Sequence, residues 1–128
     1  EFFHGYTYSG HPLACAAGIA AMEVYQDEDL FSKARLLEQE LEHQIHTLQG
    51  EPHVVDIRNL GMAGAIEFSS KLNQPSFRAM EIFQKCFERG LMVRYTGDII
   101  AIGPALVVST KEIEFIIETI RGVVRDLA

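Results

Sequence analysis

The chain has 128 residues, of which 48% are hydrophobic and 23% are charged, a composition typical of a single globular domain. Its net charge of −7 and the scattered positions of its 11 Lys and Arg residues argue against nucleic-acid binding, which requires a clustered basic surface. No apolar run approaches the roughly 20 residues of a membrane span, and the first residues lack a signal-peptide pattern. We therefore expect a cytoplasmic protein without nucleic-acid or membrane partners.

The first predicted element is a helix over residues 12–25, which follows a loop over residues 4–12 rich in Gly and hydroxyl side chains. Pro12 suits the first position of a helix, and the many alanines favour a tightly packed helix that other elements approach closely. Backbone N–H groups at a helix mouth, together with the Thr7 hydroxyl, can hold a phosphate. The alternative is that Thr7 only completes a turn.

A second helix is predicted over residues 30–49, followed by a hairpin of strands at 54–60 and 65–68. In the first strand Val55 and Ile57 are expected on one face and Asp56 and Arg58 on the other, with the two charged residues forming a surface pair. The apolar stripe of the helix comprises Leu30, Ala34, Leu37, Leu41, Ile45 and Leu48.

The second half of the sequence predicts a helix that starts at Gln74-Pro75-Ser76 and ends at residue 89, followed by strands at 91–94 and 99–102. A final helix follows, and its N-terminal cap is either a Ser109/Glu112 capping box or Thr110. The helix before Gly90 carries the stripe Phe77, Met80, Phe83 and Phe87, and the last helix carries Ile113, Ile116, Ile117, Ile120, Val124 and Leu127. The resulting order predicts an α+β fold, in which helices cover one small antiparallel sheet.

Cysteine and histidine positions give no sign of a metal site, because no CxxC or Cys/His ligand spacing is present. Cys15 and Cys86 lie among apolar residues of predicted helices, so we expect two buried, reduced thiols. His43 and His46 are expected to face solvent.

Arg94 is the second candidate for binding, because a guanidinium at a strand end can hold a carboxylate through two hydrogen bonds. The alternative is a salt bridge to Asp98. The chain has four lysines, Lys33, Lys71, Lys85 and Lys111. None of them lies where a desolvated Schiff-base lysine would be expected, and no catalytic centre is evident.

Four segments together resemble class III (omega) aminotransferases, pyridoxal-phosphate enzymes of fold type I. They occur in the family's order along essentially the whole chain: residues 5–17, 56–61 and 90–94, and Gly97-Asp98 with Pro104. The sequence Tyr-Thr-Tyr-Ser-Gly-His-Pro at 6–12 resembles that of the family branch that transfers amino groups from omega-amino acids to pyruvate. The same is true of the sequence of residues 56–66.

The resemblance implies that Thr7 and Tyr6 belong to a cofactor-binding motif, with Thr7 reaching the phosphate of the other subunit, and that Arg94 grips a substrate carboxylate. It further implies that residues 1–128 form the C-terminal small domain, without the large domain that carries the Schiff-base lysine. Such a chain would be inactive alone and would need that domain and a second subunit of a homodimer. The alternatives are another class III aminotransferase, acting on 4-aminobutyrate or a diamine, and a non-catalytic binding module.

Overall fold

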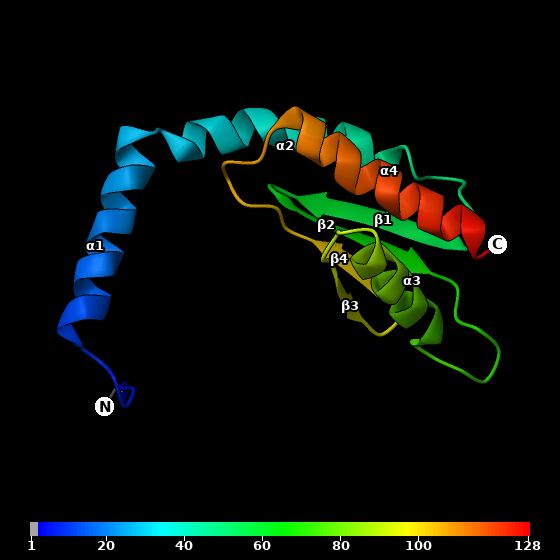
Figure 1. The fold of residues 1–128 in the computed structure, drawn as a ribbon, viewed down its shortest axis with the longest axis horizontal. Helices are drawn as coiled ribbons and strands as arrows, with labels where there is room; N and C mark the ends of the chain where they lie inside the picture. Colours follow the sequence, from blue (N-terminus) through cyan, green and yellow to red (C-terminus); the bar gives the residue numbers. More distant parts are fainter. Residues whose placement is uncertain (1–2) are drawn as a thin grey trace.

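The computed structural model describes residues 3–128 and has two parts, a compact body and a helix, α1, that extends away from it (Figure 1). The order of helices and strands is the predicted one, and the α+β fold is confirmed. No helix within the described residues is both long and apolar enough to cross a membrane. The elements are α1 (Pro12–Asp27), α2 (Leu30–His46), β1 (Val54–Leu60), β2 (Ala63–Phe68), α3 (Phe77–Glu88), β3 (Arg94–Thr96), β4 (Ile99–Ile102) and α4 (Thr110–Asp126).

The sheet is antiparallel throughout and has the strand order β1-β2-β4-β3, so that two hairpins meet through β2 and β4. A register shift between Val54 and Asp56 interrupts the alternation of β1. The prediction that Val55 shares the environment of Ile57 is therefore wrong, because the shift leaves Val55 exposed while Ile57 is buried.

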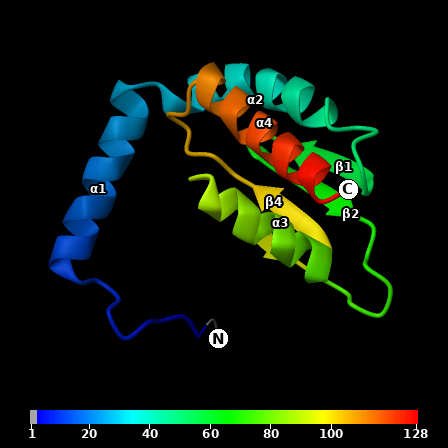
Figure 2. The ribbon, with the colours of Figure 1, turned by 45° about the vertical axis from the view of Figure 1, so that its right-hand side comes forward.

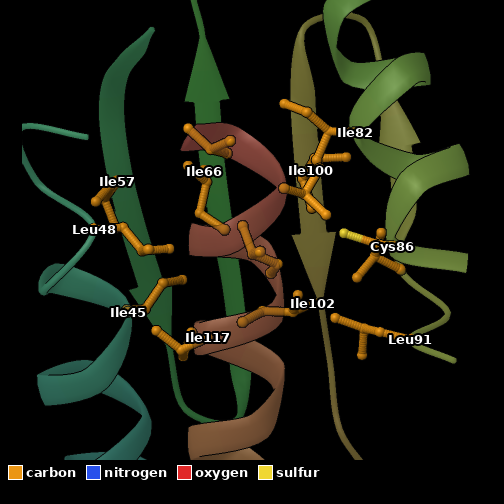
Figure 3. Packing of buried hydrophobic residues seen from close by; sticks show 14 of the residues in the cluster. Ile45, Leu48, Ile57, Ile66, Ile82, Cys86, Leu91, Ile100, Ile102 and Ile117 are labelled. Carbon is orange, nitrogen blue, oxygen red and sulfur yellow. The ribbon is translucent and has the colours of Figure 1, made fainter. Parts of the chain in front are cut away.

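One face of the sheet packs against α2, α3 and α4, which lie on the same side (Figure 2). Branched side chains of the strands and helices point toward one another there and exclude water (Figure 3). The predicted stripe of α4 is confirmed, since Ile113, Ile117 and Ile120 are fully buried. Gly64 is required by this packing, because a Cβ at its position would lie 2.5 Å from Cδ1 of Ile45 on α2.

The helix ends follow the sequence signals closely, with the exception of the stretch before β3. Ser109 and Glu112 form the predicted capping box at α4. Gly90 adopts a positive φ of 81° after α3, where the N–H of Leu91 donates to the Cys86 carbonyl and closes the helix. The strand predicted at 91–94 begins only at Arg94, and α2 ends at His46.

The buried side of α3 is rotated from the predicted stripe. Its most buried apolar residues are Ala79, Ile82 and Cys86, whereas Phe87 is exposed and stacks on the partly buried Phe83. Small and branched residues occupy the position nearest the sheet, because the close approach of α3 to β3 and β4 leaves the larger rings at the margin.

Helix α1 has no buried residue. Its aromatic contact with the body lies near its C-terminal end, where the ring of Tyr25 meets that of Phe31 on α2 edge-on. The expectation of a tightly packed helix is therefore wrong for this chain. Cys15, which lies on α1, is exposed, so only Cys86 is a buried thiol as predicted. Burial raises the pKa of Cys86 to about 11.

Candidate functional site

The face of the sheet opposite the helices carries the charged residues that sequence analysis singled out. The pairing register aligns Arg58 with Ala65, Ala65 with Ala101, and Ala101 with Arg94, so these four side chains form a row across all four strands. The next row, which contains Ile57, is directed into the core. The row from Arg58 to Arg94 is therefore on the open face.

Arg94 makes no ion pair or hydrogen bond through its side chain with any residue in the range 3–128. The alternative salt bridge to Asp98 is not formed, because the Asp98 carboxylate accepts hydrogen bonds from the Ser70 hydroxyl and from the Ser76 N–H, the latter at 2.9 Å. Arg94 borders a hollow of about 230 Å³ near Pro104 and Ile116. Its guanidinium is thus an exposed cation whose donors are available to an anion.

Arg58 has the opposite electrostatic environment. Its Nη1 lies 2.6 Å from Asp56 Oδ2 and 2.9 Å from Glu67 Oε2. The hydrogen bonds that Arg58 donates to these carboxylates, that to Glu67 first, raise the pKa of Arg58. The predicted Asp56/Arg58 pair is confirmed. Glu67 was missed, although the hairpin register, which pairs Asp56 with Glu67, carries the signal.

The loop before α1 is a turn held by its own backbone and by Ser9, whose hydroxyl accepts a hydrogen bond from the Tyr6 N–H at 2.8 Å. The ring of Tyr6 is exposed and contacts His4 edge-on. The Thr7 hydroxyl and N–H have no hydrogen-bond partner within residues 3–128. Thr7 therefore offers two free donors beside the N-terminus of α1, where His11 provides no side-chain cap.

The structure does not bring the predicted site residues together. The Thr7 loop precedes α1, at the end of this helix away from the body, whereas β3, which carries Arg94, lies in the body (Figure 1). The lysines also remain apart from the open-face row. Lys71 is paired with Glu81 at 2.5 Å and Lys85 with Glu88 at 3.1 Å, while Lys33 and Lys111 are exposed.

This arrangement and the sequence both match known proteins. A profile of the family described as "Aminotransferase class-III" matches residues 1–124, and the chain belongs to this family. The chain is 50% identical to "Omega-aminotransferase" from Caulobacter vibrioides, over 96% of the chain and 28% of that protein. It is 37% identical to "Beta-alanine--pyruvate aminotransferase" from Pseudomonas aeruginosa, over 100% of the chain and 29% of that protein.

A solved structure of similar fold is a thermostable omega transaminase fourfold mutant from Pseudomonas jessenii. The TM-score is 0.91 at 26% identity, with 99% of this chain and 30% of that chain covered. The chain thus spans less than a third of the length of each of these three relatives.

Proposed function

We propose that this chain is the C-terminal small domain of a pyridoxal-phosphate-dependent aminotransferase that transfers amino groups from omega-amino acids such as beta-alanine to pyruvate. The observation that carries the proposal is Arg94, an exposed guanidinium on the open face of a class III aminotransferase domain that forms no ion pair in the part of the chain that the structure describes. Both substrates contain a carboxylate, which a guanidinium binds through two charge-assisted hydrogen bonds. Arg94 binds and orients that carboxylate.

The donors of the Thr7 loop fit the phosphate of the cofactor. Residues 3–22 contain no acidic side chain, and both the hydroxyl and the N–H of Thr7 are free to donate. The loop contains no Lys or Arg, so it adds neutral donors to a phosphate whose charge other groups must balance. Tyr6 places its ring beside the turn, with its N–H occupied by Ser9. When bound, pyridoxal phosphate acts as the electron sink for amino transfer.

In this proposal the chain is part of a larger polypeptide, whose remaining part holds the Schiff-base lysine. Thr7 contacts the phosphate of the cofactor that is bound to a second subunit. Helix α1 supports this part of the proposal, because residues 12–22 contain no charged, amide or hydroxyl side chain and none of them is buried. A helix that is apolar on every side is normally surrounded by protein, and a helix lying on a membrane would need a polar face. We propose that the large domain surrounds α1 in a cytoplasmic homodimer.

Arg94→Ala in the full-length enzyme tests the clamp, with Arg35→Ala as the matched control. Arg35 is also exposed and forms no ion pair within residues 3–128, but it lies on α2. The measured quantity is the second-order rate constant for single-turnover amino transfer from the donor to the cofactor. For beta-alanine it should fall about 10- to 100-fold, the loss expected for charge-assisted hydrogen bonds. A donor without a carboxylate should be affected much less, and equal losses for both donors would contradict the clamp.

Thr7→Ala tests the cofactor contact, and Thr7→Ser is the control because it keeps the hydroxyl. Loss of a charge-assisted hydrogen bond should weaken retention of pyridoxal phosphate about tenfold or more, measured as cofactor released on dialysis. If the full-length gene product neither binds pyridoxal phosphate nor transfers amino groups, the chain belongs to a non-catalytic module.

A further inference from the structure

The open face has opposite charge at its two ends. At one end Arg58 is bonded to two carboxylates, so the group formed by Asp56, Arg58 and Glu67, called the Arg58 cluster below, carries a net charge of −1. At the other end Arg94 has no ion partner within the described residues. The two arginines are aligned by the register, but only Arg94 presents an uncompensated positive charge.

The surface between these ends is small and apolar. Ala65 and Ala101 occupy the central positions of the row and are partly exposed. A shallow hollow of about 390 Å³ reaches from Arg58 over Ala65 to Ala101, and Ala101 also borders the hollow beside Arg94. A substrate whose carboxylate is held by Arg94 can therefore extend over the alanines toward the Arg58 cluster.

We propose that Asp56 and Glu67 determine acceptor specificity: they neutralise Arg58 and make the far end of the open face negative, so that a monocarboxylic 2-oxo acid is accepted and a dicarboxylic one is rejected. This inference rests on the proposed function, in which Arg94 holds the first carboxylate. Without the two acids the face would present two arginines in one row, which is an arrangement suited to a dicarboxylate.

The size of this effect on anion affinity follows from the geometry of the sheet. Three strand spacings of about 4.8 Å separate the backbones of Arg58 and Arg94 by about 14 Å. A second carboxylate extending from Arg94 would lie on the order of 10 Å from the Arg58 cluster, where one unit charge changes affinity about two- to tenfold at an exposed site. The discrimination against a dicarboxylate is therefore moderate and should fall with each acid removed.

A purely structural role for the two acids would give a different result. The side chains of Asp56 and Glu67 are 56% and 41% exposed, and ion pairs at such sites contribute little to stability. Their removal should therefore leave the thermal midpoint nearly unchanged while it changes anion preference. Specificity and stability can be measured separately in the same variants.

The experiment uses Asp56→Asn, Glu67→Gln and the double variant, with Glu114→Gln as the control. Glu114 is an exposed acid of α4 that forms no ion pair with any described residue, so its replacement changes net charge but leaves the open face as it is. In the 128-residue chain, NMR titration with propionate and glutarate gives the two dissociation constants. Each single variant should increase the glutarate-to-propionate affinity ratio about two- to tenfold and the double variant more, while Glu114→Gln should leave it unchanged.

The same variants of the full-length enzyme should lower KM for 2-oxoglutarate relative to pyruvate by a similar factor. An unchanged anion ratio in the double variant, or an equal shift in Glu114→Gln, would overturn the inference whether or not the enzyme transfers amino groups. Absence of amino transfer together with a changed anion ratio would instead refute the proposed function and leave the charge effect established.

Discussion

Helix α1 and the core of the body are both apolar but differ completely in burial. The body encloses Ile66, Ile100 and Ile117 without measurable exposure, whereas every residue of α1 is exposed. Helix α4 has apolar residues on one side and charges on the other, as a helix at a protein surface requires. Over residues 12–22, α1 has no polar side at all.

The two parts therefore satisfy different requirements. The body has a closed core and provides Arg94 on a rigid sheet, so its fold should not depend on α1. Helix α1 and the Thr7 loop lack such support in this chain. Substitutions matched between the two parts test this difference directly.

The largest difference is expected between Ile117→Ala and Ile19→Ala. Ile117 is fully buried between α4 and the sheet, so its truncation should lower the free energy of unfolding by about 2–5 kcal/mol. Ile19 is 60% exposed on α1, and its truncation should change the unfolding of the body by less than about 0.5 kcal/mol. Urea unfolding of both variants measures this, and equal destabilisation would mean that α1 belongs to the cooperative unit.

Among the described residues, an ion-pair network around the nearly buried carboxylate of Glu51 is found in the body, and α1 has no counterpart. The Glu51 carboxylate, whose side chain is 9% exposed, accepts hydrogen bonds from Arg121 at 2.6 Å and from Arg125 at 2.6 and 2.8 Å. The hydrogen bond from Arg125 is the main cause that lowers the pKa of Glu51 to about 2. Solvent weakens the interaction with Arg125, because this side chain is largely exposed. We therefore expect Glu51→Gln to lower the free energy of unfolding at pH 7 by about 2 kcal/mol, less than the full pKa shift would give.

The pH dependence has a defined sign. A carboxyl whose pKa is depressed in the folded state contributes its full stabilisation above the ordinary value of 4.5 and loses it as the pH falls toward about 2. The difference in free energy of unfolding between wild type and Glu51→Gln should therefore be constant from pH 7 to 5 and shrink at pH 3. Parallel curves down to pH 3 would mean that another group carries the acid sensitivity.

The sequence predicted the body well, because its periodicity and its caps agree with its packing. The stripe of α4 and the cap at Gly90 are local signals that tertiary structure reinforced. The position of Val55 could not be predicted, since a bulge depends on pairing with a distant strand. The burial of α1 was predicted wrongly for a related reason: the pattern shows that a helix is apolar but not what covers it.

The sequence indicates the candidate residues one by one but does not indicate how they are arranged in space. Arg94 and Thr7 were found from their local context and from family resemblance, and the structure shows free donors at both. The partnership of Glu67 with Arg58 depends on cross-strand register, which becomes visible only when the hairpin is aligned. Whether Thr7 meets a phosphate stays a prediction, because its proposed partners lie outside residues 3–128.

The helix starts give a smaller test of the same comparison. Ser109→Ala removes the hydroxyl that accepts a hydrogen bond from the Glu112 N–H, but keeps the backbone N–H that donates to the Glu112 carboxylate. This loss should destabilise the body by about 1 kcal/mol. His11→Ser adds a capping hydroxyl to α1, where no side-chain cap exists, and should leave the unfolding midpoint of the body unchanged. Thermal unfolding followed by near-ultraviolet signals of the body measures both, and a raised midpoint in His11→Ser would show that the two parts unfold together.

The smallest effect on the body is expected from Gly18→Ala in the middle of α1. A Cβ at Gly18 meets no atom within 4 Å, so the substitution adds only helix propensity, about 1 kcal/mol for α1 itself. Hydrogen exchange of α1 amides should slow about fivefold, since 1 kcal/mol corresponds to that factor, while amides of β2 and α4 should exchange as before. Slower exchange in α4 would show that α1 stabilises the body. Unchanged exchange in α1 would show that another copy of the chain already holds this helix, because a helix in contact with a partner no longer opens alone.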